Sequence, residues 1–143
     1  MEQTNKPRIK AMCVFLHNSK MLATKGYDKD KAETFYRLVG GSIEFGEKSE
    51  DGIKREVQEE LQCAVERLSL VKVVENIFSY NGDHGHQIIF LFKGELSDKS
   101  LYAKEKIPVI DTKSYDAVWL PLQDIMDGKI KLYPEFDINL LLS

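Results

Sequence analysis

The stretch from Gly41 to Cys63, GSIEFGEKSEDGIKREVQEELQC, places the tightest constraint on how this chain can fold. It begins as a glycine-containing turn and continues into a segment with helical periodicity. Ile53, Val57 and Leu61 recur at every fourth position, so they share one face of a helix that can bury against a core. The same segment carries carboxylates at regular spacing on another face.

These carboxylates are Glu56, Glu59 and Glu60, which stand at i, i+3 and i+4 within one helical turn. Like charges at this spacing repel by a few tenths of a kcal/mol (roughly 0.2–0.5) per pair. A hard divalent cation such as Mg²⁺ would offset that repulsion, because it takes carboxylate oxygens together with substrate phosphates. The alternative is a solvated helix face, in which Arg55 pairs with Asp51 and Glu59.

The order of residues around these carboxylates matches a known motif. Glycine, five residues, Glu, seven residues, and then Arg-Glu-apolar-x-Glu-Glu-x-Gly-apolar defines the Nudix box. The chain matches it at Gly41, Glu47, Arg55, Glu56, Val57, Glu59, Glu60 and Cys63. The one clear departure is Gln62, where the family usually has Gly. On these residues the chain resembles a Nudix hydrolase of the MutT type.

This resemblance implies an α/β fold, namely an α/β/α sandwich around a mixed β-sheet. The composition agrees, since 43% of the 143 residues are hydrophobic and 30% are charged, a balance typical of a globular protein. A chain of this length can bury a real core. No shift in composition divides it, so we expect a single Nudix domain over residues 1–143.

The resemblance also implies an enzyme that hydrolyses the pyrophosphate bond of a nucleoside diphosphate derivative (NDP-X) with Mg²⁺ or Mn²⁺. Nucleoside triphosphates are the favoured substrates, and dinucleoside polyphosphates, ADP-ribose and nucleotide sugars are alternatives. A non-catalytic nucleotide-binding regulator with a Nudix fold is the other class. Such regulators often lose box carboxylates, which this chain keeps. The net charge of −3 leaves no basic footprint for a nucleic-acid polymer.

By this resemblance Glu56, Glu59 and Glu60 are metal ligands and catalytic residues. Arg55 and Glu47 match the pair that orients the loop and the ligands. The backbone carbonyl of Gly40 would add a metal ligand, although Gly40 and Gly41 also suit a plain turn. Gly41 and Tyr80 are the predicted substrate-binding residues, with Tyr80 at a place where dinucleoside polyphosphate hydrolases of the family carry a tyrosine.

The sequence leaves the general base open. Glu56 is the candidate within the box, while Glu105, Asp111 and Asp116 lie in or beside a long polar connection. Each of these three is also compatible with a solvated loop charge. His84 and His86 flank a glycine and lack further obvious ligands, so we interpret both as loop residues.

Cellular location is predicted from apolar runs and cysteines. The apolar run at residues 11–16 is too short for a secretory signal or a membrane span, so a cytoplasmic protein with no membrane association is expected. Cys13 and Cys63 form no CxxC pair and are expected to be reduced structural residues. The sequence leaves the oligomeric state open, with a homodimer as one alternative because many relatives are dimers.

Periodicity and turn residues give a coarse list of elements. We expect a helix that Ser49 caps, a hairpin turn at residues 81–83 and a surface loop over 26–34. Expected strands are 9–16, 21–25, 35–39, one or two within 65–80, a return strand beginning at 87–92, and 115–120. Residues 97–115 form a longer connection, and Pro121 and Pro134 are expected to open two short helices, the second reaching residue 142.

Overall fold

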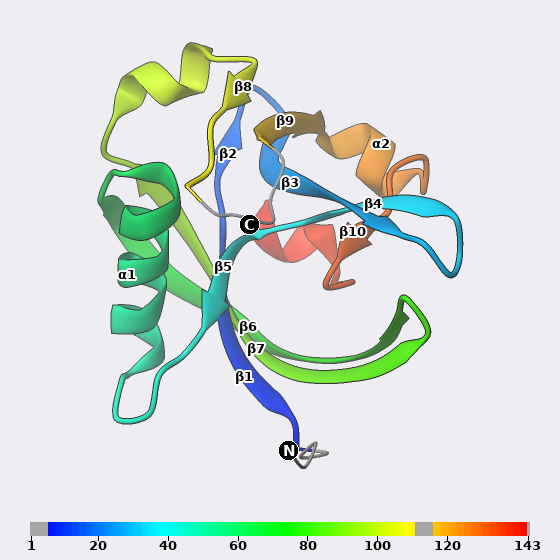
Figure 1. Cartoon of the computed structure of the whole chain (residues 1–143). Coiled ribbons are helices and arrows are strands. Elements are labelled where there is room, and N and C mark those ends of the chain that lie inside the picture. The colour runs from blue at the N-terminus through cyan, green and yellow to red at the C-terminus, as the bar shows by residue number, and fades with distance from the viewer. Residues whose placement is uncertain (1–5, 111–115, 143) are drawn as a thin grey trace.

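Two mixed β-sheets form the framework of the computed structural model, which describes residues 6–110 and 116–142 (Figure 1). The first sheet has the strand order β5-β1-β7-β6, and the described strands of the second run β10-β4-β3-β9-β8, with β2 pairing β3. The strands are β1 (Arg8–Val14), β2 (Leu16–His17), β3 (Lys20–Asp28), β4 (Glu33–Arg37), β5 (Val39–Ser42), β6 (Val65–Tyr80), β7 (Asp83–Leu96), β8 (Lys106–Ile107), β9 (Ala117–Pro121) and β10 (Leu132–Tyr133). The helices are α1 (Ser49–Leu61) and α2 (Leu122–Met126), with the 3₁₀ segments η1 (Lys99–Ala103) and η2 (Ile138–Leu141). This is the mixed α/β fold that was predicted.

Strand β1 runs through the middle of the first sheet, antiparallel to β5 and parallel to β7. Its side chains alternate between two hydrophobic cores, because successive residues of a strand point to opposite faces. Ala11 and Cys13 belong to the core under α1, whereas Met12 and Val14 belong to the core shared with the second sheet. Cys13 is a buried free thiol, as predicted.

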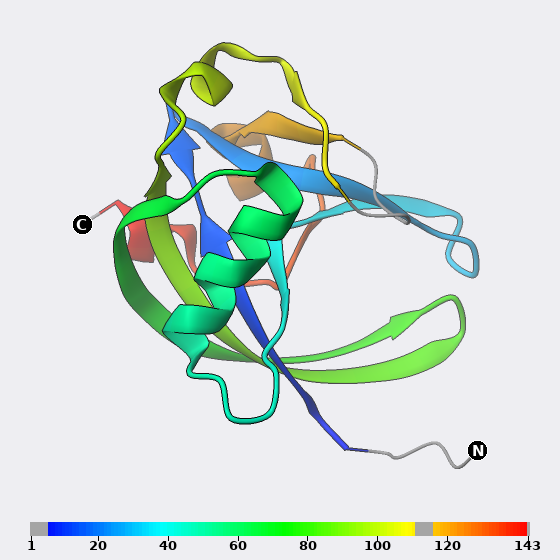
Figure 2. The same cartoon turned by 60° about the vertical axis from the view of Figure 1, so that its left-hand side comes forward.

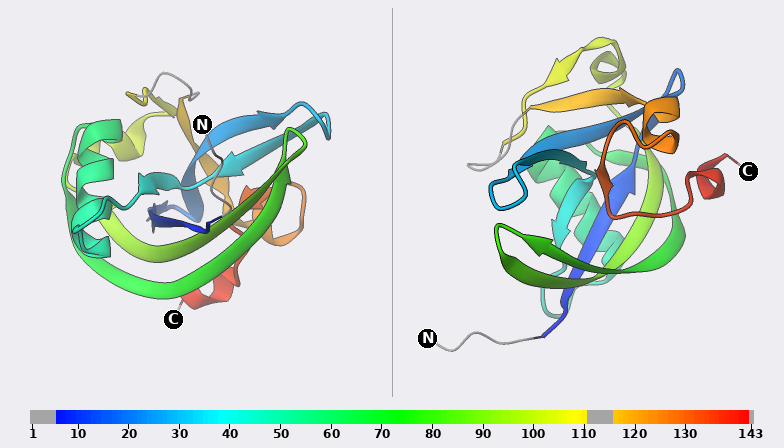
Figure 3. Two further views of the ribbon diagram at one scale, coloured as in Figure 1. Left: turned by 60° about the horizontal axis from the view of Figure 1, so that its bottom comes forward. Right: turned by 90° about the vertical axis from the view of Figure 1, so that its right-hand side faces the viewer.

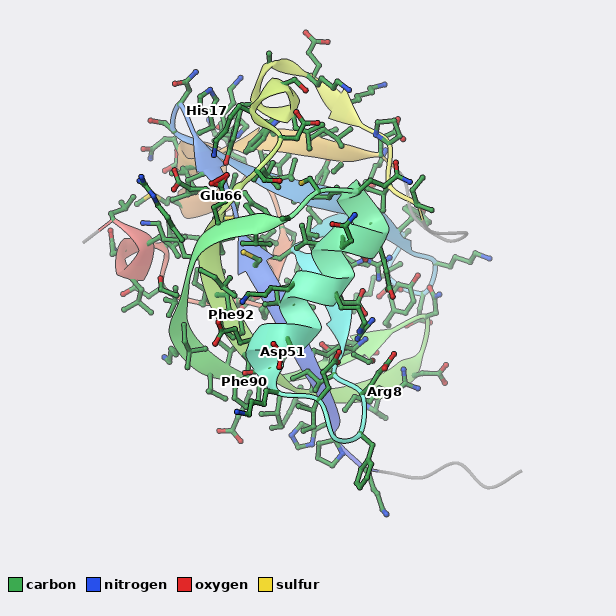
Figure 4. All side chains as sticks on the ribbon, turned by 90° about the vertical axis from the view of Figure 1, so that its left-hand side faces the viewer. Arg8, His17, Asp51, Glu66, Phe90 and Phe92 are labelled. Carbon is green, nitrogen blue, oxygen red and sulfur yellow. The ribbon has the colours of Figure 1, made fainter. Side chains whose placement is uncertain are left out.

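Helix α1 covers the outer face of the first sheet (Figure 2). Its predicted apolar face is confirmed, since Ile53 and Val57 are fully buried and Leu61 is nearly so. In Figure 4 Phe90 and Phe92 of β7 lie behind the helix and Asp51 lies on its outer side. The predicted N-cap at Ser49 was wrong, because Ser49 is already helical and Lys48 holds the cap position without a side-chain hydrogen bond.

The predicted loop over residues 26–34 was wrong, because strands β3 and β4 extend into it. They leave a short turn at residues 29–32. Gly26 makes the extension possible, since a Cβ there would lie 2.5 Å from Cζ of the Phe35 ring on the neighbouring strand. A missing side chain thus allows the polar segment to form an ordinary hairpin around a buried aromatic residue.

The long hairpin of β6 and β7 contains the turn that was predicted from Asn81-Gly82. Both residues have positive φ, 52° and 83°, as the favoured two-residue hairpin turns require. Of the two alternatives for residues 65–80, the single strand is confirmed by β6. The return strand is longer than expected, because it already begins at Asp83. Both views in Figure 3 show this hairpin curving away from the helix toward the β3–β4 hairpin.

The C-terminal elements differ from the prediction in one place. Pro121 does precede a short helix, α2. Pro134 does not open a helix, because the chain continues irregularly until the 3₁₀ turn at Ile138. Within the described part of the long connection lie η1 and β8. Across residues 6–110 and 116–142, no helix has the length and apolar character needed to cross a membrane.

Candidate active site

The glycine pair on β5 determines where the carboxylates of α1 can lie. A Cβ on Gly40 would overlap the carbonyl oxygen of Ala11, and φ of Gly40 is +151°. A Cβ on Gly41 would lie 2.5 Å from the carboxyl carbon of Glu56. The edge strand therefore leaves a gap beside Gly41, and the Glu56 carboxylate occupies it.

Two carboxylates of the helix reach a cleft between the two sheets through this gap. Glu56 and Glu60 line the cleft together with Gly40 and Gly41. The backbone N–H of Gly40 donates a hydrogen bond to Oε2 of Glu60 at 3.2 Å. Glu59 is not part of the cleft wall, and its side chain is 57% exposed. The structure thus brings together two of the three predicted metal ligands.

Arg55 connects the helix to the loop that precedes it. Its Nε donates to Oε2 of Glu47 at 2.8 Å, and its Nη2 donates to the backbone carbonyl of Ser42 at 3.0 Å. Its Nη1 donates to Glu56 at 3.1 Å and to Glu59 at 3.2 Å. This geometry is compatible with the orienting role that the resemblance implies for Arg55 and Glu47. Of the two pairs in the solvated-face alternative, Arg55–Glu59 is present, whereas Arg55–Asp51 is not among the ion pairs of the described residues.

The electrostatic environments of these carboxylates differ. Hydrogen bonds from the Arg55 side chain and from the Glu44 backbone lower the pKa of Glu47 to about 2. Burial raises the pKa of Glu56, and the charge of Glu59 raises it further, against the opposing effect of Arg55. The ionised form of Glu56 is therefore less favoured than that of Glu47. A cation bound beside Glu56 would favour its ionised carboxylate.

The donor set at this end of the cleft fits a hard divalent cation. Mg²⁺ is commonly bound by one or two carboxylates and completed by waters and substrate phosphates. Glu56 and Glu60 supply those carboxylates, and Gly40 lies beside them. Within the residues that the structure describes, no three His, Cys, Asp or Glu side chains are grouped closely enough to hold an ion by themselves.

The cleft has a volume of about 1400 Å³, and its wall carries the aromatic rings of Phe35, Phe78, Tyr80 and Tyr133. Phe35 lies edge-on to Tyr80 and to Tyr133, with ring centroids 5.6 Å apart in each case. Tyr80 therefore lies in the cleft, as predicted for a substrate-binding residue. Tyr133 was not a candidate in the sequence, because parallel pairing of β10 with β4 brings it there.

Sequence reasoning also missed a cationic set in the same wall, namely Arg8, Lys10 and Arg37. Arg8 and Lys10 alternate along β1, and Figure 4 shows Arg8 on the far side of that strand from the helix. In the sequence, the signal for Arg8 and Lys10 was the alternation of cationic residues at the start of an apolar strand. The sequence held no such signal for Arg37, because its proximity to Lys10 depends on how the two sheets pack together.

The candidate bases outside the box lie elsewhere. Glu105 and Asp116 are exposed and do not line the cleft, and Asp111 lies outside the described residues. His84 and His86 are not loop residues, because both belong to β7 and face the cleft. Glu56 is thus the base candidate that the described part of the chain places in the cleft.

The chain is similar to known proteins in sequence pattern and in fold. The family model of the NUDIX domain matches residues 6–141. A NUDIX hydrolase from Nitrosomonas europaea superposes with a TM-score of 0.68 at 17% identity, covering 96% of this chain and 87% of that one. A MutT NUDIX hydrolase from Burkholderia pseudomallei has a TM-score of 0.57 at 22% identity, with 96% and 95% covered. A protein described as an ADP compounds hydrolase has a TM-score of 0.55 at 21% identity, with 88% and 62% covered.

The family match extends over nearly the whole chain, and the solved structures share its fold. The chain belongs to the NUDIX domain family and is a Nudix hydrolase. Enzymes of this family act on small nucleoside diphosphate derivatives and generally use a divalent metal. The fold, the box and the cleft carboxylates therefore all agree on the class of enzyme.

Proposed function

We propose that this protein is a pyrophosphohydrolase that depends on Mg²⁺ or Mn²⁺ and cleaves small nucleotides, with nucleoside triphosphates as the favoured substrates. One observation carries the proposal: the carboxylates of Glu56 and Glu60 line the same cleft as several aromatic rings. The carboxylates suit a metal-bound phosphate group, and the rings offer flat surfaces for a nucleobase. A nucleotide has both of these chemical parts.

In this proposal Glu56 and Glu60 hold the metal together with the backbone of Gly40. The metal, when bound, supplies charge neutralisation for the phosphates and lowers the pKa of a water molecule. As general base, Glu56 would take a proton from the attacking water while the water oxygen bonds to phosphorus and the bridging P–O bond breaks. Water adds across the anhydride, and the two products each carry a phosphate group.

Arg55 and Glu47 act through Glu56 and are positioning residues. The hydrogen bond from Arg55 to Glu56 fixes the carboxylate, and the bonds from Arg55 to Glu47 and Ser42 fix Arg55. Glu59 serves as an additional metal ligand only when its carboxylate leaves Arg55. Gly41 leaves room for Glu56, and Tyr80 lies against the substrate.

The test is turnover of NTPs, dNTPs, ADP-ribose, dinucleoside polyphosphates and nucleotide sugars, each with Mg²⁺, Mn²⁺ or a chelator. Glu56→Gln and Glu60→Gln are compared with the matched control Glu50→Gln, which changes an exposed carboxylate on the same helix. We expect metal-dependent turnover of one substrate class that falls about a hundredfold or more in the two cleft variants. The control should keep wild-type turnover. Retained nucleotide binding with no turnover of any class would instead support a regulator.

A further inference from the structure

Four Lys and Arg residues line the cleft in the described part of the chain, and three of them come from strands of two different sheets. The fourth, Lys6, is exposed and precedes β1. Arg8 and Lys10 stand two residues apart on β1, so their side chains lie on the same face of the strand. Arg37 comes from β4 in the second sheet. All three line the cleft, and Lys10 is close enough to Arg8 and Arg37 to feel the charge of both.

In the described part of the chain, no carboxylate forms an ion pair with Arg8, Lys10 or Arg37. Over the described ranges, none of the three side chains forms a hydrogen bond or an ion pair. The other carboxylates of the wall are engaged elsewhere or peripheral. Glu33 pairs with Lys131 at 3.0 Å, the Asp28 carboxylate accepts three backbone N–H groups, and Asp83 lies at the exposed hairpin tip.

Burial and the neighbouring positive charges disfavour the protonated form of Lys10. Burial lowers the pKa of Lys10, Arg8 and Arg37 lower it further, and only Glu56 and Glu60 oppose these effects. A cation held by Glu56 and Glu60 would neutralise that opposing charge. Lys10 and Arg37, which are half-buried, and the exposed Arg8 would then form a group of positive charges without a neutralising anion.

Arg37 lies next to the aromatic rings of the cleft. It is two residues from Phe35 on β4, and it pairs with Tyr133 in the register of β10. Lys10 lies toward the opposite end, near Glu56 and Glu60. The cationic cluster therefore links the carboxylate end of the cleft to the aromatic end.

We propose that Arg8, Lys10 and Arg37 form an anion-binding subsite that holds a phosphate group of the substrate's polyphosphate chain beside the group held at Glu56 and Glu60. The inference rests on the proposed function for the rest of the substrate, since the subsite itself recognises only the phosphates. The planar guanidinium of Arg37 can hold phosphate oxygens in pairs, whereas the ammonium of Lys10 acts as a point charge. Substrates with a chain of phosphates are thereby preferred to those with one phosphate.

The experiment measures binding of inorganic tripolyphosphate by calorimetry in the presence of a chelator, so that no hydrolysis occurs. Every protein carries Glu56→Gln and Glu60→Gln, which neutralise the two carboxylates without a metal ion. This reference protein, wild type at all other positions, is compared with Arg37→Gln, Arg37→Lys and the control Lys129→Gln, which removes an exposed charge outside the cleft. We expect Arg37→Gln to weaken binding about tenfold to a hundredfold. Arg37→Lys should recover part of the loss, and Lys129→Gln should bind as the reference protein does.

Thermal unfolding without ligand provides a second measurement on the same proteins. Because Arg37 repels Lys10, we expect Arg37→Gln to unfold at a temperature no lower than the reference protein. A purely structural Arg37 would instead give a lower Tm and unchanged binding, which overturns the proposal. Equal weakening by Lys129→Gln also overturns it, because the attraction would then be diffuse.

The subsite and the proposed function can fail separately. Tripolyphosphate binding that depends on Arg37, with no nucleotide turnover by wild type, would support the subsite and refute the hydrolase. Metal-dependent turnover, together with tripolyphosphate binding that does not change when Arg37 is substituted, would support the hydrolase and refute the subsite.

Discussion

At the scale of single residues, the site depends on a position with no side chain. Gly41 lies on an edge strand, and the carboxylate of Glu56 fills the space that a Cβ would take. Extended backbone alone does not demand glycine there, so the requirement comes from the helix across the gap. The glycine of the box thus serves the carboxylate fifteen residues later.

Gly41→Ala is therefore expected to impair catalysis more than folding. The added methyl group would displace the Glu56 carboxylate, and a displacement of about 1 Å can cost about a hundredfold in kcat. Gly128→Ala is the control, because φ of Gly128 is +75° and no atom lies within 4 Å of its Cβ position. It should lose about 1–2 kcal/mol of stability and keep turnover. Steady-state kinetics and urea unfolding check both, and full activity of Gly41→Ala would contradict the account.

The ionisation of Glu47 makes the stability of the folded protein depend on pH. The pKa of Glu47 is lowered from 4.5 to about 2, chiefly by its hydrogen bonds from Arg55. The unfolded chain thus binds this proton more readily than the folded protein does. The stabilisation is complete above pH 4.5 and disappears as the pH falls through about 2.

We therefore expect Glu47→Gln to unfold at a lower temperature than wild type at pH 6, where the ion pair with Arg55 is fully formed. The difference in Tm should narrow steadily between pH 4.5 and pH 2. Thermal unfolding followed by circular dichroism across this range checks the prediction. A difference that is the same at pH 6 and pH 2 would show that charge is not the cause.

At the scale of elements, helix α1 ends on a residue that is poorly suited to its backbone. Gln62 has φ 57° and ψ 37°, the left-handed conformation that ends many helices and that glycine adopts without penalty. This is the position where the chain departs from the Nudix box. The backbone thus keeps the conformation of the motif although the residue differs.

Gln62→Gly should accordingly stabilise the protein by about 1 kcal/mol, because an L side chain in this conformation costs about that much. Gln58→Gly is the matched control, since it places the same substitution at an exposed position inside the helix. The control should lose about 1 kcal/mol. Denaturant unfolding of both variants measures the two free energies, and a loss of stability in Gln62→Gly would refute the argument.

At the scale of the whole molecule, the tips of two hairpins from different sheets meet (Figure 1). The Asp28 carboxylate accepts hydrogen bonds from the backbone N–H groups of Asp30 at 2.9 Å, Lys31 at 3.1 Å and Asn81 at 3.1 Å. Oδ1 of Asn81 accepts one from the N–H of Lys29 at 2.7 Å. These bonds join the β3–β4 hairpin to the β6–β7 hairpin beside the cleft.

Loss of this junction should loosen one end of the cleft. Asp28→Ala leaves three backbone N–H groups without their acceptor, so amide exchange over residues 78–84 should speed up about tenfold or more. Asp28→Asn keeps one acceptor oxygen and should show a smaller effect. Hydrogen exchange with mass spectrometry measures this, with Asp30→Ala as the exposed neighbouring control. Unchanged exchange in Asp28→Ala would mean that the tips are held by other contacts.

The parts of the fold that were predicted correctly are those with local causes. The buried face of α1 follows from the spacing of Ile53, Val57 and Leu61, and the β6–β7 turn follows from Asn81-Gly82. The error at residues 26–34 arose because pairing of β3 with β4 outweighed the polar composition. After Pro134, a residue that often starts helices is followed by irregular chain up to Ile138. The homodimer, the cytoplasmic location and the single-domain boundaries stay predictions.

By itself the sequence determined the class of protein, the helix and the acidic motif, because their periodicity and spacing lie within one short segment. Tertiary structure alone decided which carboxylates face the cleft, since Glu56 and Glu60 enter it and Glu59 does not. It also brought other residues into the wall, among them the rings of Phe35, Phe78, Tyr80 and Tyr133 and the cations Arg8, Lys10 and Arg37. Those residues are distant in sequence, and strand pairing between remote segments brings them together.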